Sequence, residues 1–230
     1  MLSAFTGVGF GRNSSGPIFS GITLFLDAEN FNSYPGSGST WTDLSGTQQN
    51  ISLINTPSYT LGPPSYINFN GVNQYGSGTE GGVCPSDGYT KSVWFYLNTT
   101  SADNNLISSS GSGHFMFLAG TTRIYCGHVG WDGFPLMYPS LATFNANTWY
   151  NAVLTFNTSD GMKLYINGSL DSTYTTQKTG HNGNGAINIG AFATGNLLDG
   201  RISIVQCYNR ALTLNEVKRN FQFYRSRFSL

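Results

Sequence analysis

The stretch Asn147–Gly168, NTWYNAVLTFNTSDGMKLYING, decides the fold class. It holds two apolar runs, Trp149–Phe156 and Met162–Ile166, which are joined by Asn157–Gly161. In the second run apolar and polar residues alternate, which is the period of a strand with one buried face. The connection ends in a glycine, where a left-handed backbone is tolerated. The stretch therefore predicts an antiparallel β-hairpin.

Short apolar runs broken by Gly, Asn, Asp and Pro continue along almost the whole chain, a pattern typical of β-sandwiches and barrels. Further strands are expected at Thr23–Asp27, Ser65–Phe69, Thr90–Leu97, His114–Ala119, Thr122–Cys126, Ala186–Ile189 and Arg201–Tyr208. Near the C-terminus, Thr213 and Glu216 have the spacing of a capping box, and an apolar stripe follows. One helix is therefore expected near residues 213–224, in an otherwise all-β chain. Trp94 and Trp149 lie in strands and are expected in the core.

The chain is expected to form one domain over residues 22–230, preceded by an irregular Gly/Ser-rich arm over residues 1–21. No apolar stretch reaches the roughly 18 residues of a membrane span, so membrane insertion is not expected. The N-terminus also lacks the features of a secretory signal. The three cysteines (Cys84, Cys126 and Cys207) are odd in number and include no C-x-x-C pair. A disulfide framework or a cysteine zinc site is therefore not expected.

The chain is unusually poor in charge. Of its 230 residues, 10% are charged and the net charge is zero, against about 25% charged in ordinary globular proteins. Residues 201–230 are nevertheless basic, with Glu216 as their one acid. We expect an anchoring face that contacts an acidic neighbour, rather than nucleic acid, made by Lys218, Arg219, Arg225 and Arg227. Low charge favours a protein that works in an assembly or outside a cell.

The sequence offers little for catalysis. Glycoside hydrolysis needs two carboxylates on one face, and the one pair of acids at i and i+2 is Asp27 and Glu29, which is better interpreted as a strand end. Cys126 and His128 could suggest a Cys–His nucleophile, but no third orienting group is evident. We therefore expect no catalytic residues, no metal ligands and no cofactor.

The most promising surface segment is the aromatic-rich loop Val129–Pro139. Trp131, Phe134 and Tyr138 in this loop could stack on sugar rings or form contacts with a protein partner. The alternative, that Trp131 and Phe134 close the edge of a sandwich, stays open at this point.

Several segments together resemble the laminin G-like branch of the concanavalin A-like family. They are Leu24–Ala28, Ser33–Gly38, Thr40–Gly46, Tyr66–Gly71, the hairpin Asn147–Gly168, Leu198–Val205, Tyr208–Thr213 and Asn220–Phe228. The opening and closing segments look like the version of this domain found in structural proteins of tailed phages. The resemblance implies a two-sheet antiparallel jelly-roll sandwich that binds through rim loops or its concave face. Many relatives hold a rim calcium, but Asn70 replaces an acidic ligand here, so calcium is not claimed.

The resemblance and the composition together imply a non-enzymatic virion surface protein, either a capsid decoration protein or a fibre or tail adhesion module. Its expected partners are other virion proteins, with which it would be oligomeric, and cell-surface glycans. A secreted or cell-surface lectin domain, which would be extracellular, is the alternative. A polysaccharide hydrolase is a third reading that the missing carboxylates disfavour.

Overall fold

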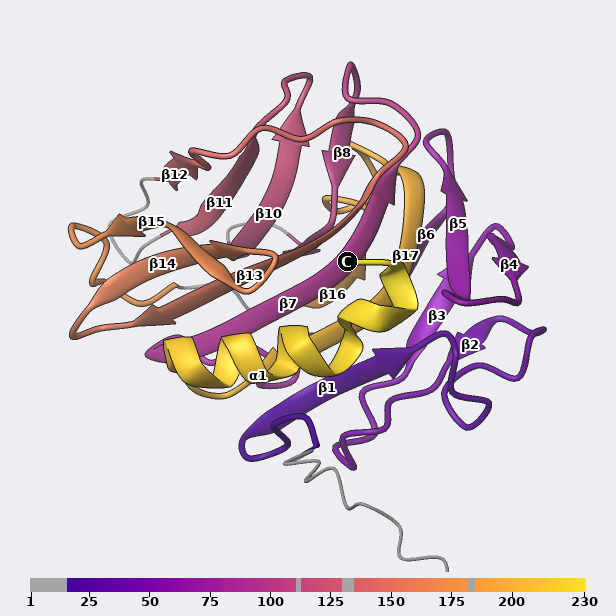
Figure 1. Cartoon of the computed structure of the whole chain (residues 1–230), viewed down its shortest axis with the longest axis horizontal. Coiled ribbons are helices and arrows are strands. Elements are labelled where there is room, and N and C mark those ends of the chain that lie inside the picture. The colour runs from indigo at the N-terminus through magenta and orange to yellow at the C-terminus, as the bar shows by residue number, and fades with distance from the viewer. Residues whose placement is uncertain (1–15, 111–112, 130–134, 182–184) are drawn as a thin grey trace, which may run out of the picture.

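The computed structural model describes residues 16–110, 113–129, 135–181 and 185–230, and these form two layers of antiparallel strands (Figure 1). The larger layer is an eight-stranded sheet with the order β15-β14-β13-β7-β17-β5-β4, in which β1 also pairs with β17. Its strands are β1 (Ile22–Asp27), β4 (Ser58–Thr60), β5 (Tyr66–Asn70), β7 (Gly88–Leu97), β13 (Trp149–Asn157), β14 (Gly161–Ile166), β15 (Ser169–Tyr174) and β17 (Asp199–Tyr208).

The second layer consists of a five-stranded and a four-stranded sheet, ordered β2-β3-β6-β16-β9 and β12-β11-β10-β8. Its strands are β2 (Thr40–Trp41), β3 (Ile51–Ile54), β6 (Tyr75–Thr79), β8 (Asp103–Asn105), β9 (Ile107–Ser109), β10 (His114–Ala119), β11 (Ile124–Val129), β12 (Pro135–Pro139) and β16 (Ala186–Ile189). Only Leu106 separates β8 from β9, so the two sheets meet along one segment of chain. The expected all-β, two-layer antiparallel jelly roll is confirmed.

The predicted hairpin forms β13 and β14, with Leu154 opposite Leu164. In its turn, the Asn157 side chain accepts the backbone N–H groups of Ser159 and Asp160, and Gly161 has φ +83°. All nine predicted strands are present, with shifts of a few residues at their ends. One expectation was wrong: residues 135–139, placed in a loop, form edge strand β12, because they pair with β11.

The core lies between the two layers and contains large buried side chains from both, among them Trp41, Phe69, Phe95 and Phe144. A second apolar cluster lies on the outer face of the large sheet, where Trp94 stacks on Phe228 with ring centroids 4.0 Å apart. Trp94 is buried there as expected. Trp149 is different: it packs at the edge of this outer cluster and is half-exposed, because the C-terminal segment covers it only in part.

The predicted helix is α1 (Leu214–Tyr224), followed by the 3₁₀ helix η1 (Arg225–Phe228). Figure 1 shows α1 lying across the outer face of the large sheet. Its apolar stripe packs Val217 against Val153 and Tyr165, and Phe221 against Trp94. The capping box is confirmed: the Thr213 hydroxyl accepts the Glu216 N–H, and the Glu216 carboxylate accepts the Thr213 N–H.

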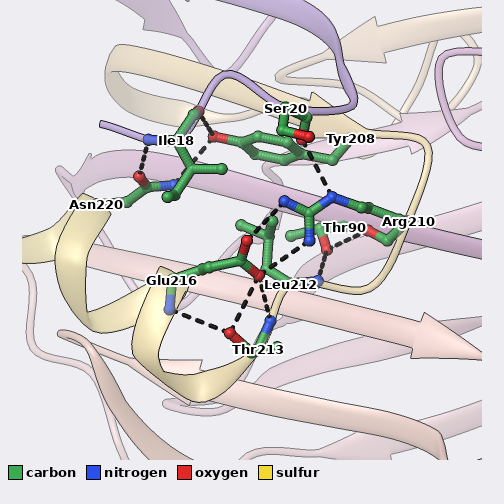
Figure 2. Close-up of polar contacts among 9 residues, drawn as sticks. All are labelled: Ile18, Ser20, Thr90, Tyr208, Arg210, Leu212, Thr213, Glu216 and Asn220. Carbon is green, nitrogen blue, oxygen red and sulfur yellow. Dashed lines mark hydrogen bonds and ion pairs between the residues drawn. The ribbon is translucent and has the colours of Figure 1, made fainter. Parts of the chain in front are cut away.

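Residues 16–21, expected in the arm, contact the domain through backbone groups (Figure 2). The Ile18 N–H donates to Asn220 Oδ1 at 2.7 Å, and the Tyr208 hydroxyl donates to the Ile18 carbonyl at 3.0 Å. Arg210 Nε donates to the Ser20 carbonyl at 3.1 Å. Ile18 and Ser20 thus contact the domain although they precede residue 22, where the domain was expected to begin. Among the described residues, none of the helices has the length and apolar character needed to cross a membrane.

Candidate glycan-binding site

An aromatic cleft lies beside the end of β1, between the loop that follows this strand and edge strand β4. It has a volume of about 270 Å³, near the lower limit of about 300 Å³ for small-molecule pockets. It is lined by Glu29, Phe31, Tyr34, Pro35, Gly36, Tyr59 and Leu61. We refer to these residues as the aromatic cleft.

Two tyrosines form the fixed part of the cleft. Tyr34 is buried, its hydroxyl donates to the Gly38 carbonyl at 2.9 Å, and its ring centroid lies 5.2 Å from that of Tyr59. Burial and the neighbouring Tyr59 raise the pKa of the Tyr34 hydroxyl, so it stays a neutral donor. Gly36 has φ +94°, and a Cβ there would contact the Tyr59 ring at 3.5 Å. The loop backbone thus lies directly against the aromatic ring.

The rim of the aromatic cleft is strongly exposed. Phe31 is 74% exposed and Leu61 is 81% exposed, and both line the same opening. Single exposed apolar residues are common, but here two of them lie beside one concave surface. The Glu29 carboxylate lies in the same lining and adds a hydrogen-bond acceptor.

The two acids at the end of β1 are bound to Arg227. Its NH1 group lies 3.0 and 2.9 Å from the two carboxylate oxygens of buried Asp27, and its Nε lies 3.7 Å from Glu29 Oε1. Asp27 also accepts the Glu29 backbone N–H at 3.0 Å. Charge-assisted hydrogen bonds to the guanidinium therefore occupy both oxygens of Asp27, and Glu29 lies beside the same side chain.

Of the three contact residues expected in the loop 129–139, the structure describes only Tyr138. Trp131 and Phe134 lie outside the described residues. Tyr138 is half-buried on β12, where its ring stacks on Tyr174 of β15 with centroids 4.2 Å apart. Its hydroxyl lies 3.0 Å from Thr176 Oγ1. Tyr138 therefore joins the edges of the two layers.

The four basic residues expected in an anchoring face are not equally available. Lys218 is exposed on α1, and Arg219 is exposed with its Nε donating to the Gly16 carbonyl at 2.7 Å. Arg225 is half-buried and donates to the Leu230 carbonyl. Arg227 is held by Asp27, as described above. Of the four, only Lys218 and Arg219 are therefore exposed.

Cys126 and His128 are both buried on β11 and do not form a nucleophilic pair. Burial raises the pKa of the Cys126 thiol to about 12 and lowers the pKa of the His128 imidazole to about 3. His128 Nδ1 lies 3.1 Å from the Tyr89 hydroxyl, and Nε2 lies 2.7 Å from the Thr179 carbonyl. Both ring nitrogens are therefore used in structural hydrogen bonds.

Asn70, for which the family resemblance implied an acidic calcium ligand in relatives, stabilises its own turn. Its Oδ1 accepts the backbone N–H groups of Val72, Asn73 and Gln74 at 3.0, 3.1 and 3.3 Å. Its Nδ2 donates to the Asn73 side chain at 3.0 Å. The oxygen that would bind a cation is thus directed at backbone donors.

Sequence reasoning missed the aromatic cleft. The one signal for it is the segment Ser33–Gly38, which indicates the family but does not by itself indicate a binding loop. Also missed was a buried cluster of Glu80, Cys84 and His114, whose ligand-type atoms all lie within 4.8 Å of one another. Glu80 and Cys84 lie in the segment after β6, but His114 lies on β10, so no local motif contains all three.

Comparisons with known proteins agree with this architecture. Residues 69–218 match the family described as the concanavalin A-like lectin/glucanases superfamily. No curated protein matches the chain.

Solved structures with the same fold include a botulinum neurotoxin type C, whose cell entry depends on interaction with two ganglioside molecules (17% identity, TM-score 0.71, 90% of this chain and 52% of the other). Another is the binding domain of Paraclostridial mosquitocidal protein 1, with 18% identity and a TM-score of 0.70 over 90% of this chain and 53% of the other. A third is the binding domain of botulinum neurotoxin DC in complex with SialylT, with 13% identity and a TM-score of 0.71 over 90% of this chain and 52% of the other. The chain spans about half the length of these structures, and such identities show the fold alone. The family match covers well over half of the sequence, and the chain belongs to the concanavalin A-like lectin/glucanase superfamily.

Proposed function

We propose that this chain is a non-enzymatic glycan-binding domain and that the aromatic cleft is its binding site. The observation that carries the proposal is the pairing of two highly exposed apolar side chains, Phe31 and Leu61, with a tyrosine-lined floor and the Glu29 carboxylate. Aromatic rings pack against the apolar faces of sugars, and a carboxylate accepts hydrogen bonds from their hydroxyl groups.

The solved structures with this fold support a binding role. One neurotoxin interacts with gangliosides, and a second is in complex with SialylT. The state of the acids argues against the hydrolase alternative, because Arg227 occupies both oxygens of Asp27 and lies beside Glu29. Lectin-type binding does not require proton transfer by Asp27 or Glu29.

The test is a glycan array on the full chain, followed by calorimetric titration of the best hit with the variants Phe31→Ala and Tyr59→Ala. Loss of one stacking face should weaken binding about tenfold, corresponding to about 1.4 kcal/mol. Phe223→Ala is the matched control, since Phe223 is an exposed phenylalanine on α1. A hit whose affinity is the same in both cleft variants would refute the site, and an array without hits would refute the function.

We further propose that the domain is displayed on a virion surface, as a capsid decoration protein or as a fibre or tail adhesion module. The low charge and the phage-like opening and closing segments support this location. Residues 1–21 and the basic C-terminal face would attach it to other virion proteins, and on that face Lys218 and Arg219 are exposed. Cryo-EM of purified particles that lack density for this chain would contradict the virion role.

A further inference from the structure

A cluster of three metal-ligand side chains is buried inside the domain, in a part of the chain that the proposed glycan site does not use. Glu80 and Cys84 come from the segment after β6, and His114 begins β10. One carboxylate oxygen, the Sγ and one imidazole nitrogen all lie within 4.8 Å of one another, and all three residues are buried. His114 Nε2 and Glu80 Oε1 are 3.0 Å apart.

The Glu80 carboxylate has one oxygen without a partner. Oε1 accepts the Cys84 backbone N–H at 3.2 Å and contacts His114. Oε2 is fully buried and has no hydrogen-bond partner among the described residues. Leaving a carboxylate oxygen unpaired away from water costs free energy, so such an atom in a folded protein points to an absent partner. A cation bound to Oε2 would remove that cost.

The surroundings hold the three ligands in place. His114 Nδ1, on the opposite side of the ring from Nε2, lies 3.2 Å from the buried Lys91 Nζ. With an ion on Nε2 the ring proton is on Nδ1, so Lys91 would have to accept it as a neutral amine. His181 Nε2 lies 2.7 Å from the Cys84 carbonyl and so positions the segment that carries two of the ligands. Cys207, opposite Lys91 in the strand register, is buried as well.

We propose that Glu80, Cys84 and His114 bind one divalent transition-metal ion of the zinc type, with Glu80 contributing both oxygens. Thiolate, imidazole and carboxylate are the donors that zinc takes in proteins, usually four in a tetrahedral arrangement. Because the cluster is closed to solvent, the ion would be structural. It would fasten the segment after β6 to β10, which belong to different sheets of the second layer. The proposal is independent of glycan binding.

The experiment uses the full chain, unfolded in denaturant with a chelator and refolded with or without Co²⁺, a spectroscopic substitute for Zn²⁺. The expected result is one ion per chain by elemental analysis, together with a thiolate-to-cobalt charge-transfer band in the near ultraviolet. The melting temperature should be higher with Zn²⁺ than with chelator, since an ion that binds only the folded chain stabilises it. Refolded wild type without stoichiometric metal, or without the thiolate band, would overturn the proposal.

Two variants and one control assign the ligands. Cys84→Ser should abolish the charge-transfer band, and His114→Gln should lower metal content several-fold. Cys126→Ser is the control, because Cys126 is an equally buried cysteine whose thiol instead donates to the Tyr138 carbonyl at 3.6 Å. A charge-transfer band retained in Cys84→Ser but lost in Cys126→Ser would refute the site. If a ligand variant does not fold, the wild-type spectrum and the Cys126→Ser spectrum still decide between the outcomes.

Discussion

The ion pair at the start of α1 leads to a prediction about stability and pH. Arg210 binds Glu216 through two nitrogens, at 2.9 and 2.7 Å, while the same carboxylate caps the helix (Figure 2). The Arg210 side chain, together with the Thr213 donors, holds the Glu216 pKa at about 2. The substitution Glu216→Gln removes the charge, and glutamine keeps a side-chain acceptor for the capping box.

The expected loss of stability in Glu216→Gln follows from the lowered pKa of Glu216 and the solvent exposure of the ion pair. A fall from 4.5 to about 2 would correspond to about 3 kcal/mol at 1.36 kcal/mol per pKa unit, before screening. The Glu216 and Arg210 side chains are 24% and 33% exposed, so solvent screening reduces the contribution to about 1 kcal/mol. For a chain of this size we expect Glu216→Gln to lower the melting temperature by about 2–4 °C at pH 7.

The assay is thermal or urea unfolding of wild type and Glu216→Gln over a pH series. Because folding lowers the Glu216 pKa, its stabilising effect is complete above about pH 4.5 and disappears as the pH falls toward 2. The difference between the two proteins should therefore shrink over this interval. Lys163→Gln is the control, since its ion pair with Asp160 is 35% and 58% exposed and should contribute nothing measurable. A difference that stays constant from pH 7 to pH 2.5 would refute the reasoning.

Three further predictions concern packing, backbone geometry and thiol chemistry. Phe228→Ala should destabilise the domain by about 3 kcal/mol and shift tryptophan emission to longer wavelength, because Phe228 stacks on Trp94; unchanged emission would count against this. Gly161→Ala should reduce stability and soluble yield more than Gly38→Ala. A Cβ at Gly161 would clash with the Tyr174 carbonyl, whereas a Cβ at Gly38 meets nothing within 4 Å. Equal losses of stability in denaturant titrations of the two variants would contradict this prediction. The three buried cysteines should not react with a thiol reagent until the chain unfolds, since all are buried and free; rapid labelling of the native chain would show this to be wrong.

The main strands and the helix could be predicted because their own residues carry the signal. Trp149–Phe156 and Met162–Ile166 are apolar runs joined by turn residues, and Thr213 with Glu216 marks the start of α1. The missed strands are short or polar. Asp103–Asn105 and Ser58–Thr60 become strands because a neighbouring strand supplies their hydrogen bonds, an effect of tertiary structure that local propensity does not reveal.

The candidate sites were harder to predict because each is assembled from separate elements. Tyr34 lies in the loop after β1 and Tyr59 lies on β4, and they meet because β4 pairs at the edge of the large sheet. Glu80 and His114 are likewise brought together by the folding of the second layer. Sequence reasoning did recognise the shortage of acids correctly, but it could not show that Arg227 binds the one pair present.

The position of β17 has a consequence for folding during synthesis. This strand pairs with β7 on one side and with β5 and β1 on the other, yet the ribosome makes it after every other strand. Until about residue 208 has emerged, β1, β5 and β7 expose unpaired edges, which are sites for aggregation. Because β17 lies between β7 and the pair β1 and β5, these strands can join one sheet only after β17 has been made. Ribosome-bound chains that stop before residue 199 should remain sensitive to protease where the full-length chain is resistant.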